Sequence, residues 1–286
     1  MSTPINYLLH LADNALVLGQ RNAEWCGHGP ILEEDLALAN MSLDLIGQAR
    51  LLYSLVAKRA PTLAADASAL PPEGAFAPWG GSAALHGGQL TEDTLAYFRD
   101  VPDFRNHTLL ELPHHGALVG YAKGNLDYAT TIVRNFLFSA LMVPLWQQLT
   151  TCADTDLAAI AAKSVKEAGY HLRHSRDWLV KLGDGTDESH ARVQASLEHL
   201  LPYTQEFWML SALEKEATDA GVVIDWAQLS ADWNALLDDA LAEATLTRPS
   251  AGGYVSQGKL GQHSEHLGYL LAEMQSLARA HPGATW

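Results

Sequence analysis

The segment DTDLAAIAAKSVKEAGYHLRHSRDWLVKL, residues 154–182, is the stretch that most clearly predicts a helix. Asp154 or Thr155 can cap its first turn, and Gly183 can take the left-handed position just past its end. Side chains three and four residues apart form one apolar stripe, which runs through Leu157, Ala161, Val165, Ala168, Leu172, Ser175, Leu179 and Leu182. A helix with such a stripe is typical of a bundle, where the stripe packs against neighbouring helices.

Helical patterns also dominate the rest of the chain, because strand-like alternation is hard to find and Val and Ile are sparse beside Leu and Ala. We expect Pro144 and Pro202 to bend the helices that contain them. The helix expected at about 31–58 is apolar on almost every side, as in a helix buried inside a bundle. The other expected helices run from Ile5 into the twenties and over about 92–99, 125–150, 189–213, 226–245 and 262–280.

Long helices with few strands favour an all-α bundle of antiparallel helices with long loops. The chain has 286 residues, of which nearly half are apolar, so one domain over 1–286 can bury a sizeable core. A Pro-, Gly- and Ala-rich segment at about 60–88 is interpreted as a long inserted loop. A second irregular region is expected around 102–124.

The composition narrows the range of partners and compartments. With 18 Lys and Arg against 33 Asp and Glu, the net charge of −15 repels nucleic acid and anionic membranes. Cys26 and Cys152 show neither metal-ligand spacing nor a disulfide framework. No signal peptide is evident, and the most apolar stretch, 136–146, is too short to span a bilayer. We therefore expect a cytoplasmic protein that binds neither nucleic acid nor membrane.

A large acidic helical bundle raises the question of a carboxylate-bridged di-iron centre. Such a centre uses about four carboxylates and two histidines, usually from two Glu-x-x-His motifs whose ligands share one helix face. The one literal match, Glu111-Leu112-Pro113-His114, contains a proline and lies in an irregular region. It cannot present both groups from one unbroken helical turn, so we assign no metal-binding and no catalytic residue.

The best helical candidate is Glu167-Ala168-Gly169-Tyr170-His171, in which tyrosine takes the place of the ligand three residues on. Glu167, His171 and His174 share a face at the edge of the apolar stripe. This face is either a metal site or a hydrogen-bonded seam against another helix or partner. His263 and His266 near the C-terminus leave a similar choice between a zinc site and a polar helix end.

A polar stripe also follows the helix expected at about 31–58. Its members are Glu33, Asn40, Asp44 and Gln48, spaced so that they lie on one side of the helix. If this side is buried, its carboxylates need partners, for which Lys163, Lys166 and Arg134 are candidates. The alternatives are a solvated face or a polar core where a metal once bound.

Eight short segments stand out in order along the chain: DNALVLGQR (13–21), EWCGH (24–28), DLALAN (35–40), LDLIGQAR (43–50), KEAGYHLR (166–173), LGDGTD (182–187), EATL (243–246) and HSEHLG (263–268). Together they resemble one known family, the structural subunit of the phenylacetyl-CoA epoxidase complex. The series covers nearly the whole chain. The segments 60–88 and 105–124 look longer than the family pattern.

The resemblance implies a ferritin-like helical bundle that forms a heterodimer with a homologous catalytic subunit. That partner carries the di-iron centre, and a reductase with FAD and an iron–sulfur cluster supplies electrons from NADPH. The complex epoxidises the ring of phenylacetyl-CoA in aerobic phenylacetate catabolism, and this chain binds no cofactor. Asp44, Glu167 and His171 then stand at a degenerate metal position.

The resemblance also implies that this chain contacts coenzyme A. The matching segment is Asp103, Phe104, Arg105 and Asn106, in which Arg105 could pair with a phosphate and Phe104 could pack on an apolar stem. The alternative is an ordinary surface loop.

Three functions follow from these patterns. The leading interpretation is a non-catalytic subunit that stabilises the di-iron catalytic subunit. A catalytic di-iron oxidase or oxygenase with atypical ligands is the second. The third is a stand-alone helical scaffold, which would expose no apolar patch large enough to indicate a missing partner.

Overall fold

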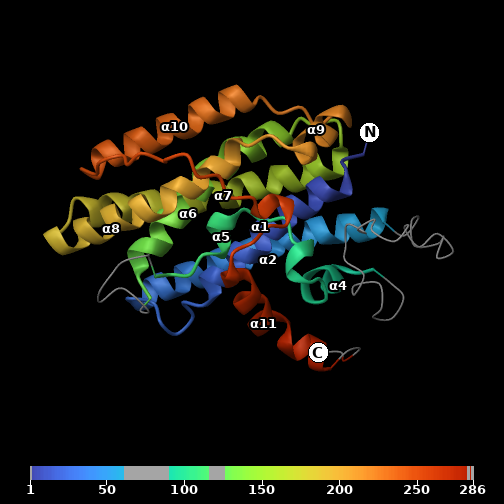
Figure 1. The fold of residues 1–286 in the computed structure, drawn as a ribbon, viewed down its shortest axis with the longest axis horizontal. Coiled ribbons are helices and arrows are strands. Elements are labelled where there is room, and N and C mark those ends of the chain that lie inside the picture. The colour runs from blue at the N-terminus through green and yellow to red at the C-terminus, as the bar shows by residue number, and fades with distance from the viewer. Residues whose placement is uncertain (1, 61–89, 116–125, 282–283, 285–286) are drawn as a thin grey trace.

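A computed structural model describes residues 2–60, 90–115, 126–281 and 284, and these residues fold as a helical bundle (Figure 1). Four long helices form its centre: α1 (Ile5–Ala23), α2 (Leu32–Arg59), α6 (Tyr128–Leu149) and α7 (Thr155–Gly183). α1 packs along α2, α6 packs along α7, and α2 also contacts α7. The described residues contain no strand beyond one isolated bridge between Gln257 and Gln262. The prediction of an all-α, ferritin-like bundle is confirmed.

The core is built around α6. Its sequence is apolar nearly throughout, and side chains on every side of the helix are buried, from Ala129 and Ile132 to Trp146 and Leu149. By length and composition α6 could cross a membrane, but 94% of its most apolar window is buried inside the bundle. α6 is therefore the core helix of this fold, and Pro144 lies inside it without ending it.

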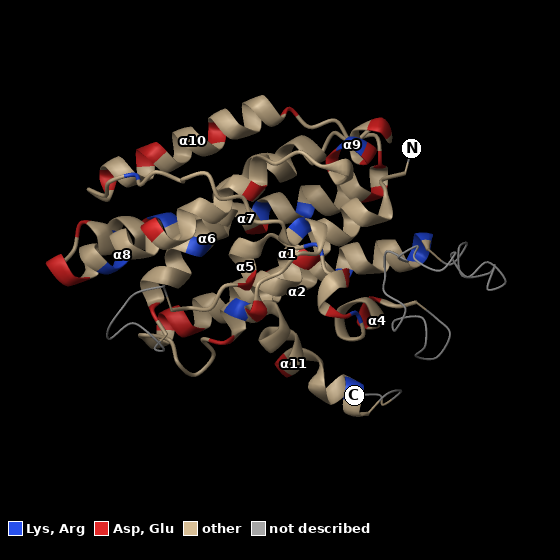
Figure 2. Ribbon diagram, in the orientation of Figure 1, with Lys and Arg blue, Asp and Glu red and all other residues tan. Residues whose placement is uncertain are grey.

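Shorter elements cover two sides of the four long helices (Figure 1). α8 (Asp187–Leu200) and α10 (Trp226–Glu243) pack on α6 and α7, whereas α4 (Glu92–Tyr97) and α11 (Glu265–Ala280) pack near α1 and α2. The remaining elements are η2 (Val101–Asp103), α5 (Thr108–Glu111), η3 (Leu201–Trp208), α9 (Ala212–Asp219) and η4 (Gly258–Leu260). Figure 2 shows acidic residues gathered at the outer end of α8, where Asp184, Asp187 and Glu188 lie.

The prediction of one bent helix over 189–213 is wrong. α8 ends at Leu200, Pro202 stands at the start of the 3₁₀ helix η3, and a new helix begins after Ser211. Proline has no N–H to continue the helical hydrogen bonds, so the chain tightens instead of bending. A capping box between Ser211 and Glu214 then starts α9.

The region expected to be irregular, 102–124, also contains two short helices, η2 and α5. The second half of that region and the inserted loop at 61–88 lie outside the described residues.

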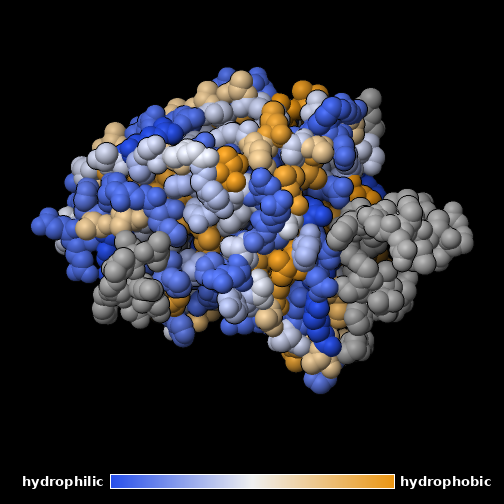
Figure 3. All heavy atoms as spheres, in the orientation of Figure 1, coloured by the Kyte–Doolittle hydropathy of each residue, from blue (hydrophilic) through white to orange (hydrophobic). Residues whose placement is uncertain are grey.

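The expectation that α2 is buried on almost every side is also wrong. One side of α2 packs on α1 and α7, but the other side exposes large apolar side chains. Leu32, Leu36 and Leu43 are 72%, 56% and 67% exposed. On the face that Figure 3 shows, hydrophobic side chains are interspersed with hydrophilic ones.

A buried ion pair joins the first two helices to the segment that follows α4. Asp13 of α1 and Arg99 are both fully buried and form a salt bridge. The Tyr53 hydroxyl of α2 donates to Asp13 Oδ1 at 2.5 Å, and the Arg105 amide donates to Asp13 Oδ2 at 2.7 Å. The Arg99 guanidinium lies over the Phe104 ring at 4.2 Å. The carboxylate is therefore neutralised and hydrogen-bonded on all sides, as a buried charge requires.

A second buried cluster holds the segment between α10 and α11. Glu206 of η3 accepts hydrogen bonds from the Lys259 amide at 2.7 Å, the Thr108 amide at 3.0 Å and the Ser256 hydroxyl at 2.7 Å. The buried Lys259 ammonium in turn pairs with Glu214 of α9 at 2.6 Å. Burial raises the pKa of Glu206, but nearby His107 and the two amides outweigh burial and lower the pKa to about 2.

Arg99→Met should lower the free energy of unfolding by about 3–5 kcal/mol, because it leaves the Asp13 carboxylate buried without its counter-charge. Urea denaturation measures the loss. The matched control is Arg248→Met, which removes a more exposed pair with Asp238 and should cost less than about 1 kcal/mol. Equal losses in the two variants would contradict the role given to the Asp13–Arg99 pair.

Glu206 should make stability pH-dependent on the acid side. Its folded pKa of about 2 lies below the ordinary value of 4.5, so its contribution is complete above pH 4.5 and is lost as the pH falls toward 2. Over this window Glu206→Gln should lose stability less steeply than the wild type, by up to about 1.4 kcal/mol per pH unit. Urea midpoints at pH 7, 5 and 3 check this, and parallel curves would refute it.

Candidate functional site

The candidate site is the polar seam between α2 and α7, defined by Glu34, Asp44 and Gln48 of α2 with Glu167, His171 and His174 of α7. The two helices lie side by side, so polar residues three and four apart on each helix face one another across the contact. The seam contains all three residues that the family resemblance places at a degenerate metal position: Asp44, Glu167 and His171.

Each α7 side chain of the seam is joined to one α2 side chain. His171 Nε2 lies 3.1 Å from Asp44 Oδ2, and His174 Nε2 lies 2.8 Å from Glu34 Oε2. The Gln48 amide donates to Glu167 Oε2 at 2.9 Å. The seam is therefore a row of separate pairs, and no side chain in it bridges two others across the helices.

The pairs are closed off further by neighbouring groups. The Tyr128 hydroxyl of α6 donates to Glu34 Oε2 at 2.6 Å, and Lys163 forms a salt bridge with Glu167 at 2.8 Å. Burial and the hydrogen bond to Glu34 raise the pKa of Tyr128, so its hydroxyl stays protonated. One oxygen of each carboxylate and Nε2 of each histidine are thus already used for hydrogen bonds, whereas His174 Nδ1 is buried without a partner among the described residues.

The space beside the seam is too small for a bimetallic centre. At the middle of the bundle, a void of about 10 Å³ is lined by Gln48, His171, Ser139, Trp146 and neighbouring apolar side chains. This volume holds about one water molecule. Nowhere in the described ranges do three His, Cys, Asp or Glu side chains come together in a geometry that could hold a metal ion. The residues present therefore do not fit a di-iron centre.

The predicted partners of the polar stripe on α2 are wrong. Lys163 pairs with Glu167 on its own helix, and Lys166 is exposed. Arg134 is fully buried, but it donates to the backbone carbonyls of Leu112 and Pro113 and to His114. Burial, together with nearby Arg21, lowers its pKa to about 9. Within the stripe itself, Glu33 and Asn40 are exposed, so only Asp44 and Gln48 belong to the seam.

Glu111 and His114 are both buried, but they point to different partners. Glu111 accepts from Asn106 and from the Ser264 amide, and it contacts His263 Nδ1 at 2.7 Å. His114 contacts the Arg21 carbonyl through Nε2 and the Thr131 hydroxyl through Nδ1. The two side chains of the literal Glu-x-x-His match therefore bind separate partners.

His263 is more buried than a polar residue at a helix end would be. Its side chain is completely buried between Glu111 and the Phe104 carbonyl, which lies 3.0 Å from Nε2. His266 is partly exposed, and its carbonyl accepts from Arg21. These two histidines anchor the start of α11 and do not converge on a metal position.

The segment 103–106 is mostly interior. Phe104 and Asn106 are fully buried, and Asp103 is nearly so. Arg105 is half-buried, and its guanidinium donates to the Pro102 and Phe104 carbonyls at 2.6 and 2.7 Å. In this conformation Phe104 packs under Arg99, and Arg105 is the member of the segment that solvent reaches most.

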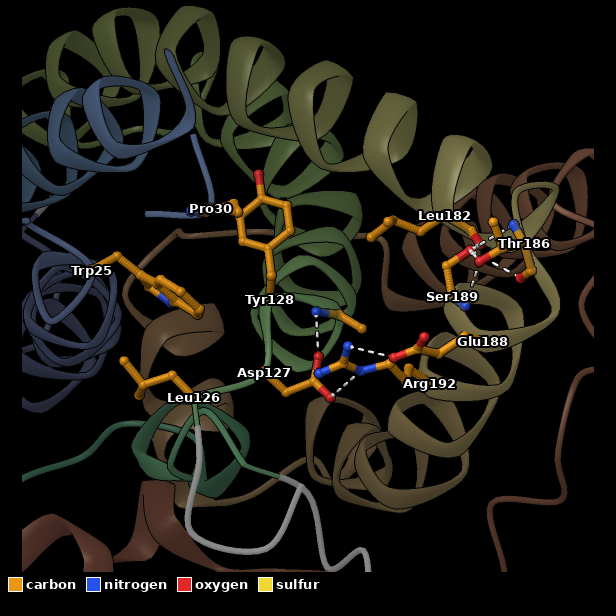
Figure 4. A pocket seen from close by; sticks show the side chains of 11 residues that line it. Trp25, Pro30, Leu126, Asp127, Tyr128, Leu182, Thr186, Glu188, Ser189 and Arg192 are labelled. Carbon is orange, nitrogen blue, oxygen red and sulfur yellow. Dashed lines mark hydrogen bonds and ion pairs between the residues drawn. The ribbon is translucent and has the colours of Figure 1, made fainter. Parts of the chain in front are cut away.

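A larger cavity lies at one end of the bundle, where α6 begins and α7 ends (Figure 4). Its volume is about 430 Å³, and its wall consists of Trp25, Pro30, Leu126, Asp127, Tyr128, Ala129, Leu182, Thr186, Glu188, Ser189 and Arg192. Arg192 already pairs with Asp127 and Glu188, while Thr186 and Ser189 cap α8. Because its polar groups are partnered within the chain, the cavity shows no preference for a particular ligand.

Two members of the site were missed in the sequence. Glu34 was not singled out, although it lies on the same side of α2 as Gln48, and Tyr128 stands in a different helix. The spacing of 14 residues between Glu34 and Gln48 amounts to about four helical turns, so the positions were available to a search for residues on one face. No spacing in the sequence predicts the hydrogen bond from Tyr128 to Glu34, because this contact depends on how α6 packs against α2.

Asp44→Leu should lower the free energy of unfolding by about 1–3 kcal/mol, because it leaves His171 Nε2 buried without a partner. The double variant Asp44→Leu/His171→Leu should recover part of this loss, since both polar groups are then gone. Thermal unfolding with and without added Fe²⁺ completes the test, and iron should leave the wild-type Tm unchanged. A rise of Tm with iron that Asp44→Leu abolishes would indicate a metal site.

Comparison with known proteins agrees with the motif resemblance. The model of the family described as phenylacetic acid catabolic protein matches residues 1–286. A protein of Escherichia coli (strain K12) that is named as one of the subunits of 1,2-phenylacetyl-CoA epoxidase is 41% identical over 280 residues, covering 98% of each chain. The chain therefore belongs to the phenylacetic acid catabolic protein family.

Proposed function

We propose that this chain is the structural, non-catalytic subunit of a multicomponent oxygenase that epoxidises the aromatic ring of phenylacetyl-CoA. The relative from Escherichia coli is named as one subunit of such an epoxidase, and the similarity extends over nearly the whole of both chains. The reaction belongs to aerobic phenylacetate catabolism, and we place the complex in the cytoplasm.

The observation that carries the non-catalytic role is the pairing within the α2–α7 seam. A di-iron centre needs carboxylates and imidazoles that converge on shared metal ions. Here each imidazole meets one carboxylate, at 3.1 Å for His171 and 2.8 Å for His174, and the adjoining void has room for about one water. These oxygen and nitrogen atoms bind one another within the chain and do not converge on a shared position.

The proposed role is to stabilise a homologous catalytic subunit that carries the di-iron centre. Exposed leucines on α2 give this chain apolar surface that a partner can bury, which a stand-alone scaffold would not need. Burying such surface would hold the partner's helices in place and thereby its substrate channel. A reductase with FAD and an iron–sulfur cluster would deliver electrons from NADPH to the partner, while this chain binds no cofactor itself.

A contact with coenzyme A forms part of the proposal, with Arg105 as its most accessible residue. A guanidinium is suited to a phosphate because it donates two parallel hydrogen bonds. Phe104, Asp103 and Asn106 are buried, so they would act by holding the backbone that presents Arg105.

Reconstitution tests the proposed function directly. The purified chain should contain well below one iron per chain, and epoxidation of phenylacetyl-CoA should require this chain together with a di-iron catalytic subunit and reductase. Product formation and oxygen uptake are measured with each component omitted in turn.

The variant His171→Leu separates the rival functions. A subunit that only stabilises its partner should support turnover as the wild type does once the variant is shown to be folded. A catalytic subunit with atypical ligands should lose activity with the same change. Stoichiometric iron in the isolated chain, or turnover without the catalytic subunit, would overturn the proposal.

A further inference from the structure

The exposed side of α2 has the pattern of a helix that packs against another helix. Its outward residues follow at alternating intervals of four and three: Leu32, Leu36, Ala39, Leu43, Ile46 and Arg50. Leu32, Leu36 and Leu43 are more than half exposed, and Ala39 and Ile46 are partly exposed. This spacing is typical of the seam between two packed helices. Among the described elements α4 reaches one end of the stripe, where Arg50 pairs with Glu92 at 3.4 Å, and the three leucines stay exposed.

Gly47 lies in the middle of α2, beside this stripe. A glycine inside a helix costs about 1 kcal/mol relative to alanine, so its presence calls for a reason. Within the described part of the chain, a Cβ at Gly47 would meet nothing within 4 Å. These residues therefore do not require the glycine, whereas a second backbone approaching α2 at this point would.

The neighbouring edge of α7 carries positive charge. Lys163, Lys166 and Arg173 lie on its exposed side together with Tyr170, over which Arg173 stacks at 5.7 Å. These residues recur at the helical repeat, so they form one strip that runs beside the seam. A basic strip on a chain with a net charge of −15 favours contact with an acidic surface.

We propose that the leucine stripe of α2 and the basic strip of α7 together bind one α-helix of the catalytic subunit, with a small or flat residue opposite Gly47 and carboxylates facing Lys163, Lys166 and Arg173. This inference rests on the proposed function and adds the location and chemistry of the contact. The alternating spacing of the leucines selects a helix as the occupant. The strip of positive charge selects a helix with an acidic flank.

Gly47→Ala tests the inference, because it should have opposite effects on the chain and on the complex. Alanine favours the helix, so the isolated chain should gain about 1–3 °C in Tm. Binding to the catalytic subunit should weaken, by about tenfold for Gly47→Leu and by less for Gly47→Ala. Affinity is measured by titrating the wild-type and variant chains with the purified catalytic subunit.

Gly268→Ala is the matched control. Gly268 lies inside α11, where the nearest described atom to an added Cβ would be Val101 Cγ2 at 4.0 Å, and α11 packs on α1, α4, α5 and η2. It should raise Tm in the same way and leave the affinity unchanged. Lys166→Glu should weaken binding most at low salt, since an exposed charge acts through a screened field.

The outcomes separate this inference from the proposed function. If the wild type binds the catalytic subunit and the Gly47 and Lys166 variants bind equally well, the proposed location is wrong and the proposed function stands. If the wild type does not bind, the proposed function fails first. Sedimentation of the isolated chain measures whether it dimerises. If the wild type is a dimer and Gly47→Leu is a monomer, the stripe binds a second copy and the proposal is overturned.

Discussion

The carboxylate of Asp13 is the constraint on which the arrangement of the helices depends. It lies in the interior, where an unpaired charge is too costly to keep, so every segment that supplies a partner is fixed in place. Those partners come from α2, from Arg99 after α4 and from the backbone at Arg105. The two oxygens of the Asp13 carboxylate thus align α1 with α2 and hold the 99–105 segment against these helices. Phe104 lies in that segment and is therefore buried.

The polar side chains of the α2–α7 seam also need partners, and they find them in a different way. There carboxylates are paired with imidazoles, side chain by side chain, and Asp44 is 38% exposed. In a metal centre the carboxylates would be neutralised jointly by the ions, and the histidines would stay neutral ligands. Pairing removes that demand, and it lets the helices approach until the space between them is nearly closed. A bundle with a metal centre and this bundle therefore differ in what their carboxylates and imidazoles bind: metal ions in the first, and each other in the second.

Patterns within one helix were sufficient to predict most of the architecture. The 154–182 segment became α7 with Asp154 as its N-cap, because capping and periodicity act locally. The grouping of Glu167, His171 and His174 on one face followed from the same periodicity. Two predictions were wrong for physical reasons. The helix expected over 189–213 is interrupted because a 3₁₀ helix begins where Pro202 stands, and α2 is not buried on every side because the leucines on one side stay exposed. An apolar residue in a sequence does not tell which molecule covers it.

Contacts between distant segments were beyond such patterns. The pairing of Glu34 with His174 and Tyr128 joins three helices, and that of His263 with Glu111 spans 152 residues of the chain. Neither is encoded by spacing within a helix, because each depends on how the helices cross. Asp44, Glu167 and His171 were singled out from the family resemblance, but the geometry of their pairs came only from the packed structure.

The small void beside His171 has a consequence for the choice of residues around it. Met142 and Trp146 line this void, and sulfur and indole side chains are among those that reactive oxygen species damage most readily. A protein that activated oxygen at its centre would risk oxidising these side chains itself. On the proposed non-catalytic role, bulky oxidisable side chains can fill the interior, and the bundle gains packing density from them.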